Sequence, residues 1–258
     1  MEVHHHTHAG HDSRRGKKIR EYFLEFLMMF LAVTLGFFAE NVREHFGDAS
    51  REKEYMSAMF DELKSDTVEY DKALGKIFYL RPLFDSLVIN IKKAKDFNYT
   101  LDGKWNTPVN EAGVPYLPTL PIIQQLKSSG NLRLVRNKTI AKKMLEYDAF
   151  IQGGMKSATA NVSAAAERIF AFEDKLCDEA EFNRQTDENM HANATQYNME
   201  NGSVYNMRLL VKDSVTLNEF ANSFINYKAR NWGYYTLLNT AKKMAADLIN
   251  LLKEEYHF

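Results

Sequence analysis

Cysteine, proline and glycine are all scarce in this sequence of 258 residues. The single cysteine, Cys177, excludes a disulfide scaffold, a CxxC redox centre, a four-cysteine zinc site and an iron–sulfur cluster within one chain. Only 5 prolines and 12 glycines are present, and four of those prolines lie between residues 108 and 121. So few helix-breaking residues leave long uninterrupted segments, which are typical of helices.

The net charge is also close to zero, because 33 Lys and Arg residues are balanced by 34 Asp and Glu residues. This balance excludes attraction of the whole protein to nucleic acid, and we expect no nucleic-acid partner. The sequence has no glycine-rich phosphate loop, no Walker lysine and no G-x-S-x-G turn, so we expect neither an enzyme activity nor a cofactor. Apolar residues are plentiful at 45%, which is far too many for a disordered chain.

Residues 21–40 form the most informative segment, because Glu25 is the only charge between Tyr22 and Ala39. As a helix, this segment would span about 30 Å, which is the thickness of the hydrocarbon core of a bilayer. A buried helix of a soluble protein is rarely apolar on every face. A cleaved signal peptide would need a small residue where Phe37 stands. We therefore predict an uncleaved transmembrane helix.

The charges on either side of this helix predict its orientation. Three basic residues follow it, namely Arg43, Arg51 and Lys53, whereas five precede it. Those five are Arg14, Arg15, Lys17, Lys18 and Arg20. The side with more Lys and Arg stays in the cytoplasm, so the N-terminus is expected inside and the rest of the chain outside.

One face of the predicted span carries small residues and a carboxyl group. The residues recur at spacings of four and three, which aligns them on a helix: Glu25, Met29, Ala32, Gly36 and Ala39. Small residues let two helix backbones approach closely, and a polar group in such a seam avoids lipid. This pattern predicts a helix–helix seam; the alternative is that Glu25 only reaches the lipid headgroups.

The remaining sequence reads as helices separated by one long loop. Residues 41–97 are expected to form a stalk and the first bundle helices, with an apolar stripe from Met56 to Ile77 and an end or kink at Pro82. Residues 98–121 form a Pro-rich loop. In residues 122–258 we expect further helices, including a break at Gly153–Gly154 and a last helix opened by a capping box of Thr216 and Glu219 with a staple of Val215 and Phe220.

These segments predict an all-α fold. The N-terminal transmembrane helix would continue into a stalk, followed by an antiparallel helical bundle. Residues 1–20 would then be a cytoplasmic tail rich in histidine and basic residues.

Three blocks of the sequence resemble a family of uncharacterised single-pass inner-membrane proteins of Gram-negative bacteria. They are KKIREYFLEFLMMFLAVTLGFFAENVREH, REKEYMSAMFDELKSDT and LPTLPIIQQLKSSGNLRLVRNKTIAKKMLEYD. The His-rich start is also similar to that of some members. The resemblance implies an inner-membrane anchor and a helical periplasmic domain, but it brings no established activity and no functional residues.

Histidines cluster at the N-terminus, where His4, His5, His6, His8 and His11 stand within eleven residues. Neutral imidazoles this dense can bind nickel, copper or zinc. The alternatives are a purification tag and an unstructured tail whose affinity for metal is incidental, because no acidic or cysteine ligand fixes a geometry.

Three functional hypotheses follow from these features. The first is a non-catalytic scaffold or accessory subunit of a membrane complex, with the lipid bilayer, further copies of itself or other membrane and periplasmic proteins as partners. The second is an extracytoplasmic sensor that binds a small ligand between bundle helices and signals through a partner. The third is a metal-handling protein that uses the N-terminal histidines.

Overall fold

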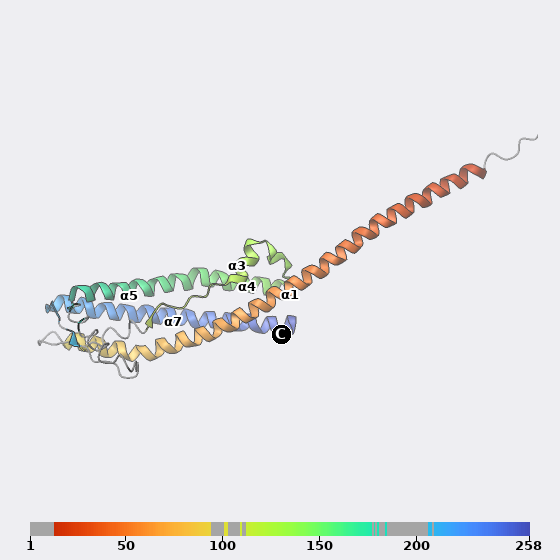
Figure 1. Cartoon of the computed structure of the whole chain (residues 1–258). Coiled ribbons are helices and arrows are strands. Elements are labelled where there is room, and N and C mark those ends of the chain that lie inside the picture. The colour runs from red at the N-terminus through yellow and green to blue at the C-terminus, as the bar shows by residue number, and fades with distance from the viewer. Residues whose placement is uncertain are drawn as a thin grey trace, which may run out of the picture. The chain divides into compact units, whose positions relative to one another are not determined.

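The computed structural model describes residues 13–93, 101–102, 109, 112–176, 178, 180, 184, 206–207 and 209–258. Nearly all of these residues are helical, so the all-α class is confirmed (Figure 1). The chain divides into two units, Met1–Glu54 and Tyr55–Phe258. Each unit is described by itself.

Helix α1, Ser13–Lys93, is the longest element and runs through both units. Its part within Met1–Glu54 contains residues 21–40, whose apolar side chains are exposed, among them Met28 at 71% and Phe37 at 72%. Among the described residues, α1 is the one helix long and apolar enough to cross a bilayer, and none of its apolar window is buried in the protein. By length and composition, the first unit therefore contains a possible membrane span.

The second part of α1 contributes the predicted stripe to the core of Tyr55–Phe258. Met56, Leu63, Tyr70 and Leu74 are all buried. Of the two alternatives at Pro82, an end or a kink, the end is wrong, because α1 continues through this proline to Lys93. The kink stays a prediction. Phe84, just beyond the proline, is buried and packs this part of the helix against the core. This burial offsets the backbone hydrogen bond that the proline cannot make.

Helix α3, a 3₁₀ turn and helix α4 follow the Pro-rich segment. Pro121 starts α3, Pro121–Ser128, since its missing N–H is not needed at a first helical position. Gly130 takes the left-handed φ of 71° that stops this helix, and a 3₁₀ turn, Asn131–Leu134, follows. Helix α4, Lys138–Phe150, begins where the Asn137 side chain accepts hydrogen bonds from the N–H groups of Thr139 and Ile140.

The expected break at Gly153–Gly154 is wrong. The backbone continues from α4 through a π-helical turn, Ile151–Met155, into α5, Lys156–Leu176. Ile151 and Met155 are fully buried on either side of the two glycines. Their packing keeps the chain helical. A π-helical turn holds one more residue than an α-helical turn, and this keeps the buried faces of α4 and α5 aligned.

Helix α7, Ser214–Tyr256, carries the longest apolar stripe of the second unit. The residues of this stripe are all buried: Leu217, Phe220, Phe224, Tyr227, Tyr234, Leu238, Ala241, Ala245, Leu248 and Leu252. The predicted capping box is wrong, because Asp213 is the N-cap and accepts from the N–H groups of Val215 and Thr216. Thr216 is thus already inside the helix, and Val215 is 65% exposed instead of forming a staple.

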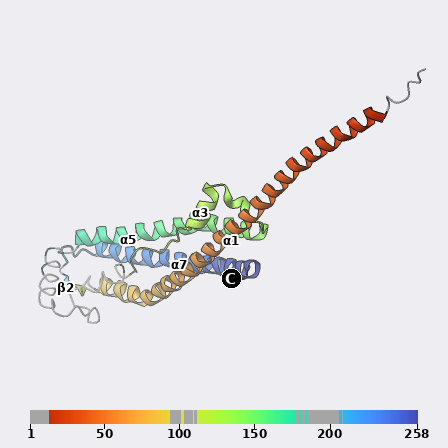
Figure 2. The same cartoon turned by 45° about the vertical axis from the view of Figure 1, so that its right-hand side comes forward.

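Helices α5 and α7 lie side by side along much of their length, as both views show (Figures 1 and 2). The N–H of Leu210 donates to the carbonyl of Leu176, so α7 begins close to the end of α5. Two strands of two residues each, β1 Leu101–Asp102 and β2 Asn206–Met207, pair antiparallel. Residues 113–120 contain neither helix nor strand. The predicted loop 98–121 also holds β1, its last residue starts α3, and most of the rest lies outside the described residues.

Candidate functional site

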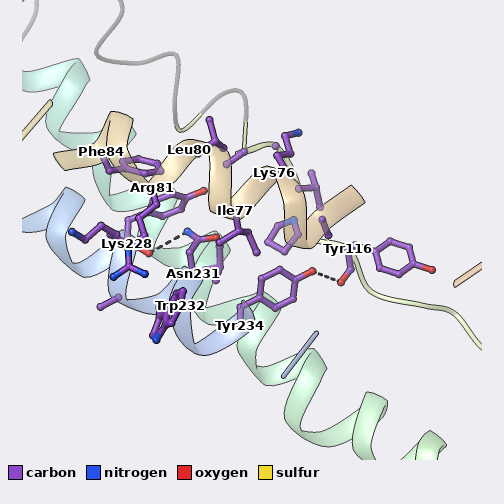
Figure 3. Close-up of a pocket in the computed structure, with 18 of the residues that line it drawn as sticks. Lys76, Ile77, Leu80, Arg81, Phe84, Tyr116, Lys228, Asn231, Trp232 and Tyr234 are labelled. Carbon is purple, nitrogen blue, oxygen red and sulfur yellow. Dashed lines mark hydrogen bonds between the residues drawn. The ribbon is translucent and has the colours of Figure 1, made fainter. Parts of the chain in front are cut away.

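A cavity of about 570 Å³ lies within Tyr55–Phe258 (Figure 3). Its walls come from three parts of the chain: α1 from Glu69 to Phe84, the segment 112–116, and α7 from Ile225 to Tyr234, with Val162 of α5 added. Its volume is within the range of roughly 300–1,000 Å³ that is typical of small-molecule sites.

Most of the wall is apolar or aromatic. Leu80, Phe84, Tyr227 and Tyr234 are buried, and Ile77 is half-buried beside them. The rings of Phe84 on α1 and Tyr227 on α7 are 5.2 Å apart between centroids, so aromatic contact joins the two helices at one end of the cavity. These rings are large and rigid, and they offer flat surfaces to a bound molecule.

Cationic side chains surround this apolar wall. Lys72 forms an ion pair of 2.6 Å with Glu69, one turn away on α1. Lys228 of α7 pairs with Asp85 of α1 and so holds the two helices together. A bound molecule therefore meets an apolar floor and a positively charged rim.

Arg81 and Trp232 meet at this rim. The guanidinium carbon of Arg81 lies 4.4 Å from the centroid of the Trp232 ring. Trp232 is 46% exposed, and Tyr235 stacks on it with 4.9 Å between centroids and 4° between planes. A cation–π contact at this distance attracts the guanidinium group to the face of the indole ring.

The segment 112–116 is fastened to both neighbouring helices through Tyr116. The Tyr116 hydroxyl donates to Oδ1 of Asp66 on α1 at 2.7 Å. Its carbonyl oxygen accepts from the hydroxyl of Tyr234 on α7 at 2.6 Å, a contact drawn in Figure 3. Because both tyrosines also line the cavity, the position of this segment decides the shape of the site.

Asp66, which accepts the hydrogen bond from the lining residue Tyr116, belongs to a buried hydrogen-bond network. Its Oδ2 accepts from the Tyr147 hydroxyl of α4 at 3.4 Å, and the hydroxyls of Tyr147 and Tyr70 are 2.8 Å apart. Burial raises the pKa of Asp66, while the hydrogen bonds from Tyr116 and Tyr147 act in the opposite direction. The network joins α1, α4 and the segment 112–116 through hydrogen bonds between side chains of the protein.

A second acidic group of α1 lies one turn away. Glu62 accepts a hydrogen bond of 3.3 Å from the backbone N–H of Ile122. Burial raises the pKa of Glu62 to about 7; the Ile122 hydrogen bond lowers it and the charge of Asp66 raises it further. This carboxyl group changes charge near neutral pH.

The structure places the predicted seam on α1, in the unit Met1–Glu54, away from the cavity residues in sequence. All five seam residues, Glu25, Met29, Ala32, Gly36 and Ala39, are exposed. A Cβ atom added at Gly36 would meet nothing within 4 Å, so this face is open within the single chain. Its use as a seam stays a prediction.

The other predicted residues lie at the start of the chain. Arg14, Arg15, Lys17 and Lys18 fall on the first turns of α1, and Arg20 is exposed. His4, His5, His6, His8 and His11 lie outside the described residues. In the part of the chain that the structure describes, no group of three or more His, Cys, Asp or Glu is placed to hold a metal ion.

The sequence alone did not single out the cavity. Its walls join residues as distant as Arg81 and Trp232, and no local pattern connects them. One signal was available: Tyr70 and Tyr234 are polar-tipped residues on otherwise apolar stripes, and buried tyrosines usually find a hydroxyl partner.

The chain matches no protein-family model, no curated protein and no solved structure. The resemblance to inner-membrane proteins described above therefore stays a prediction.

Proposed function

We propose that this chain is a membrane-anchored, non-catalytic protein whose outer helical domain binds a small molecule in the cavity between α1 and α7. It acts as an accessory subunit that senses this molecule and passes on its occupancy to a partner in a membrane complex. The cavity, with its aromatic floor and cationic rim, is the observation that carries the proposal.

The anchor in this proposal is residues 21–40, as a single transmembrane helix of the bacterial inner membrane. The tail of residues 1–20 is cytoplasmic, and Tyr55–Phe258 is a periplasmic antiparallel bundle. Support comes from the exposed apolar face of α1 and from the excess of basic residues before it.

Binding is favoured over catalysis by the groups that face the cavity. Among its described lining residues, Glu69 is the one carboxylate, and it is paired with Lys72. The hydroxyls of Tyr116 and Tyr234 are both engaged inside the protein. None of these described groups lies beside another in the nucleophile–base pair that acid–base or nucleophilic catalysis uses.

The test is ligand screening on the full-length chain in lipid nanodiscs. A fragment library is read by saturation-transfer NMR for the parent and two variants. Ala73 lines the cavity and is half-buried, so Ala73→Phe fills the site, whereas Ala58→Phe makes the same change at an exposed position of the same helix. We expect fragments that bind the parent and Ala58→Phe but not Ala73→Phe. Fragments that bind all three proteins equally would show that the cavity is not the site.

A further inference from the structure

We propose that the molecule bound in this cavity is an amphipathic organic anion, with a flat apolar body between α1 and α7 and a carboxylate, sulfonate or phosphate group held by Arg81. This inference rests on the proposed function and names the chemical class of its ligand. It follows from the charge, the stacking and the hydrogen bonding of the wall.

Charge around the cavity is one-sided. The lining residues include four cations, Lys72, Lys76, Arg81 and Lys228, against the single carboxylate of Glu69. Two of the cations are neutralised, because Lys72 pairs with Glu69 and Lys228 pairs with Asp85. Arg81 and Lys76 form no ion pair with any described residue, so the wall keeps a positive charge that an anion would balance.

Arg81 is also oriented in advance of binding. Its guanidinium group lies 4.4 Å from the centre of the Trp232 ring, and Figure 3 shows it reaching from α1 toward this ring on α7. This cation–π contact restricts where the guanidinium group can lie, and a guanidinium carries five N–H donors in a fixed fork. Two parallel N–H donors in a fixed plane match the two oxygens of a carboxylate or sulfonate group.

Three neutral polar side chains of the wall are already occupied. The Tyr116 hydroxyl donates to Asp66, the Tyr234 hydroxyl donates to the Tyr116 carbonyl, and the Asn231 amide donates to the Tyr227 carbonyl at 3.1 Å. A sugar or another neutral polar ligand would lose hydrogen bonds to water and would depend on Arg81 and Lys76 for replacements, without balancing their charge. An apolar body loses nothing there and gains contact with Phe84 and Tyr227.

A matched pair of fluorescent probes tests this class. Anilinonaphthalene sulfonate carries a flat apolar body and one sulfonate, and N-phenylnaphthylamine carries the same body without the charge. The sequence has two tryptophans, so Trp105→Phe leaves Trp232 as the only energy donor to a bound probe. The full-length chain with this change is titrated in phosphatidylcholine nanodiscs, and energy transfer from Trp232 reports occupancy.

Three variants on this background separate charge from geometry. Arg81→Gln removes the guanidinium, and Arg81→Lys keeps the charge without the planar fork. Arg230→Gln is the control, because Arg230 is exposed on α7 beside the cavity but is not part of its wall. We expect Arg81→Gln to weaken binding of the sulfonate probe about tenfold, the effect of losing one charge-assisted contact. The affinity of Arg81→Lys for this probe should lie between those of the parent and Arg81→Gln, and Arg230→Gln should bind it as tightly as the parent does.

The neutral probe should bind the parent more weakly than the sulfonate probe and should not respond to Arg81→Gln. Equal binding of both probes, blocked by Ala73→Phe but indifferent to Arg81→Gln, would overturn the anion class and leave the proposed function standing. If Ala73→Phe binds both probes as the parent does, the cavity is not the site and both proposals fail.

The anionic group can belong to a free metabolite or to a lipid headgroup, and a second arm distinguishes these sources. The titration is repeated in phosphatidylglycerol nanodiscs. Weaker probe binding to the parent, but not to Arg81→Gln, would assign the site to an anionic lipid. Unchanged binding would assign it to a free organic anion.

Discussion

At the scale of single residues, Glu62 fills a role that the local sequence of α3 cannot fill. The residue before α3 is Leu120, whose left-handed φ of 52° and apolar side chain give the helix no side-chain cap. The first N–H groups of a helix have no partner within it. Glu62, which belongs to α1, accepts a hydrogen bond from the N–H of Ile122 and so supplies the missing acceptor from another element.

This arrangement makes the stability of the second unit depend on pH. The carboxyl pKa of Glu62 is about 7 in the folded chain, against 4.5 as the ordinary value. Between these two values the folded chain holds a proton that the unfolded chain has released. The free energy of unfolding therefore falls as the pH rises through this window and changes little above it. The raised pKa of Asp66 acts in the same direction.

We predict that Glu62→Gln removes part of this fall, because glutamine keeps an oxygen for Ile122 and carries no charge. Thermal unfolding of the full-length chain in detergent would be followed from about pH 5 to about pH 7.5. Relative to the parent, the variant should gain about 1 kcal/mol, or about 2–4 °C in Tm, across this range; the side chain is partly exposed, so the full shift is discounted.

Asp61→Asn is the control, since Asp61 is an exposed carboxylate on the same helix. Its Tm should follow the parent at every pH. Parallel pH curves for Glu62→Gln and the parent would contradict the argument, because they would mean that burial of Glu62 does not favour its protonated form.

At the scale of elements, the start of α7 depends on Asp213. Its carboxylate accepts from the N–H groups of Val215 at 3.2 Å and Thr216 at 2.9 Å. Hydrogen bonding from Thr216 is the main reason that the pKa of Asp213 is lowered. We predict that Asp213→Ala lowers the Tm of the full-length chain by about 2–4 °C, the usual effect of a lost N-cap in a domain of this size.

Asp213→Asn should retain most of this stability, because asparagine is also a good N-cap. Differential scanning calorimetry of the two variants beside the parent would measure the difference. An Asp213→Ala protein that melts with the parent would show that the first turn of α7 contributes nothing to the cooperative unit.

The elements also show which features of this fold can be predicted from sequence. The stripes of α1 and α7 were predictable because the helical period reports burial directly, from Met56 on one helix to Leu252 on the other. The wrong predictions, such as a helix end at Pro82 and a break at Gly153–Gly154, came from local sequence signals that tertiary packing overrode. The pair Gly153–Gly154 sits in a continuous helix because buried residues on both sides fix the path of the chain.

The candidate site was less predictable than the fold. A cavity depends on which side chains face each other across α1 and α7, and periodicity gives the buried face without giving the partner. Arg81 illustrates this limit: its contact with Trp232 spans 151 positions of sequence, from 81 to 232. Likewise, the role of Asp66 appears only when Tyr116 and Tyr147 are brought to it.

The apolar part of α1 carries a prediction of its own, that two copies of the chain meet along the face of Ala32 and Gly36. Replacing both with leucine should keep two backbones from approaching closely and remove most of the cross-linked dimer of the full-length chain in membranes. A Cβ atom at Gly36 meets no described residue within 4 Å, so we attribute a loss of dimer to contacts between chains. Glu25→Leu should remove a polar contact in the same seam.

Thr34→Leu is the matched control, because Thr34 lies on another face of the helix and its hydroxyl bonds only to the Phe30 carbonyl among the described groups. It should cross-link as the parent does. Equal dimer in the parent, the double variant and Glu25→Leu would mean that these residues face lipid.

At the scale of the whole molecule, the proposed function depends on which side of the membrane receives Tyr55–Phe258. A ligand-binding domain outside the cytoplasm meets molecules from the environment, and it can signal only through the anchor and its partners. Five basic residues before the span and three after it favour that orientation. The difference is small, which makes the basic tail a sensitive place to change the orientation.

We predict that protease added to intact spheroplasts digests a chain carrying a C-terminal epitope, because the proposed orientation puts the domain after the span outside the cytoplasm. Replacing Arg14, Arg15, Lys17, Lys18 and Arg20 with glutamine leaves the excess of positive charge after the span, at Arg43, Arg51 and Lys53. A fraction of this variant should insert with the opposite orientation, so that its epitope resists protease until the spheroplasts are lysed. Complete protection of the parent epitope, with a periplasmic marker digested in the same sample, would place the cavity in the cytoplasm. In that case the cavity would meet metabolites made inside the cell, and the screen for its anionic ligand would begin with them.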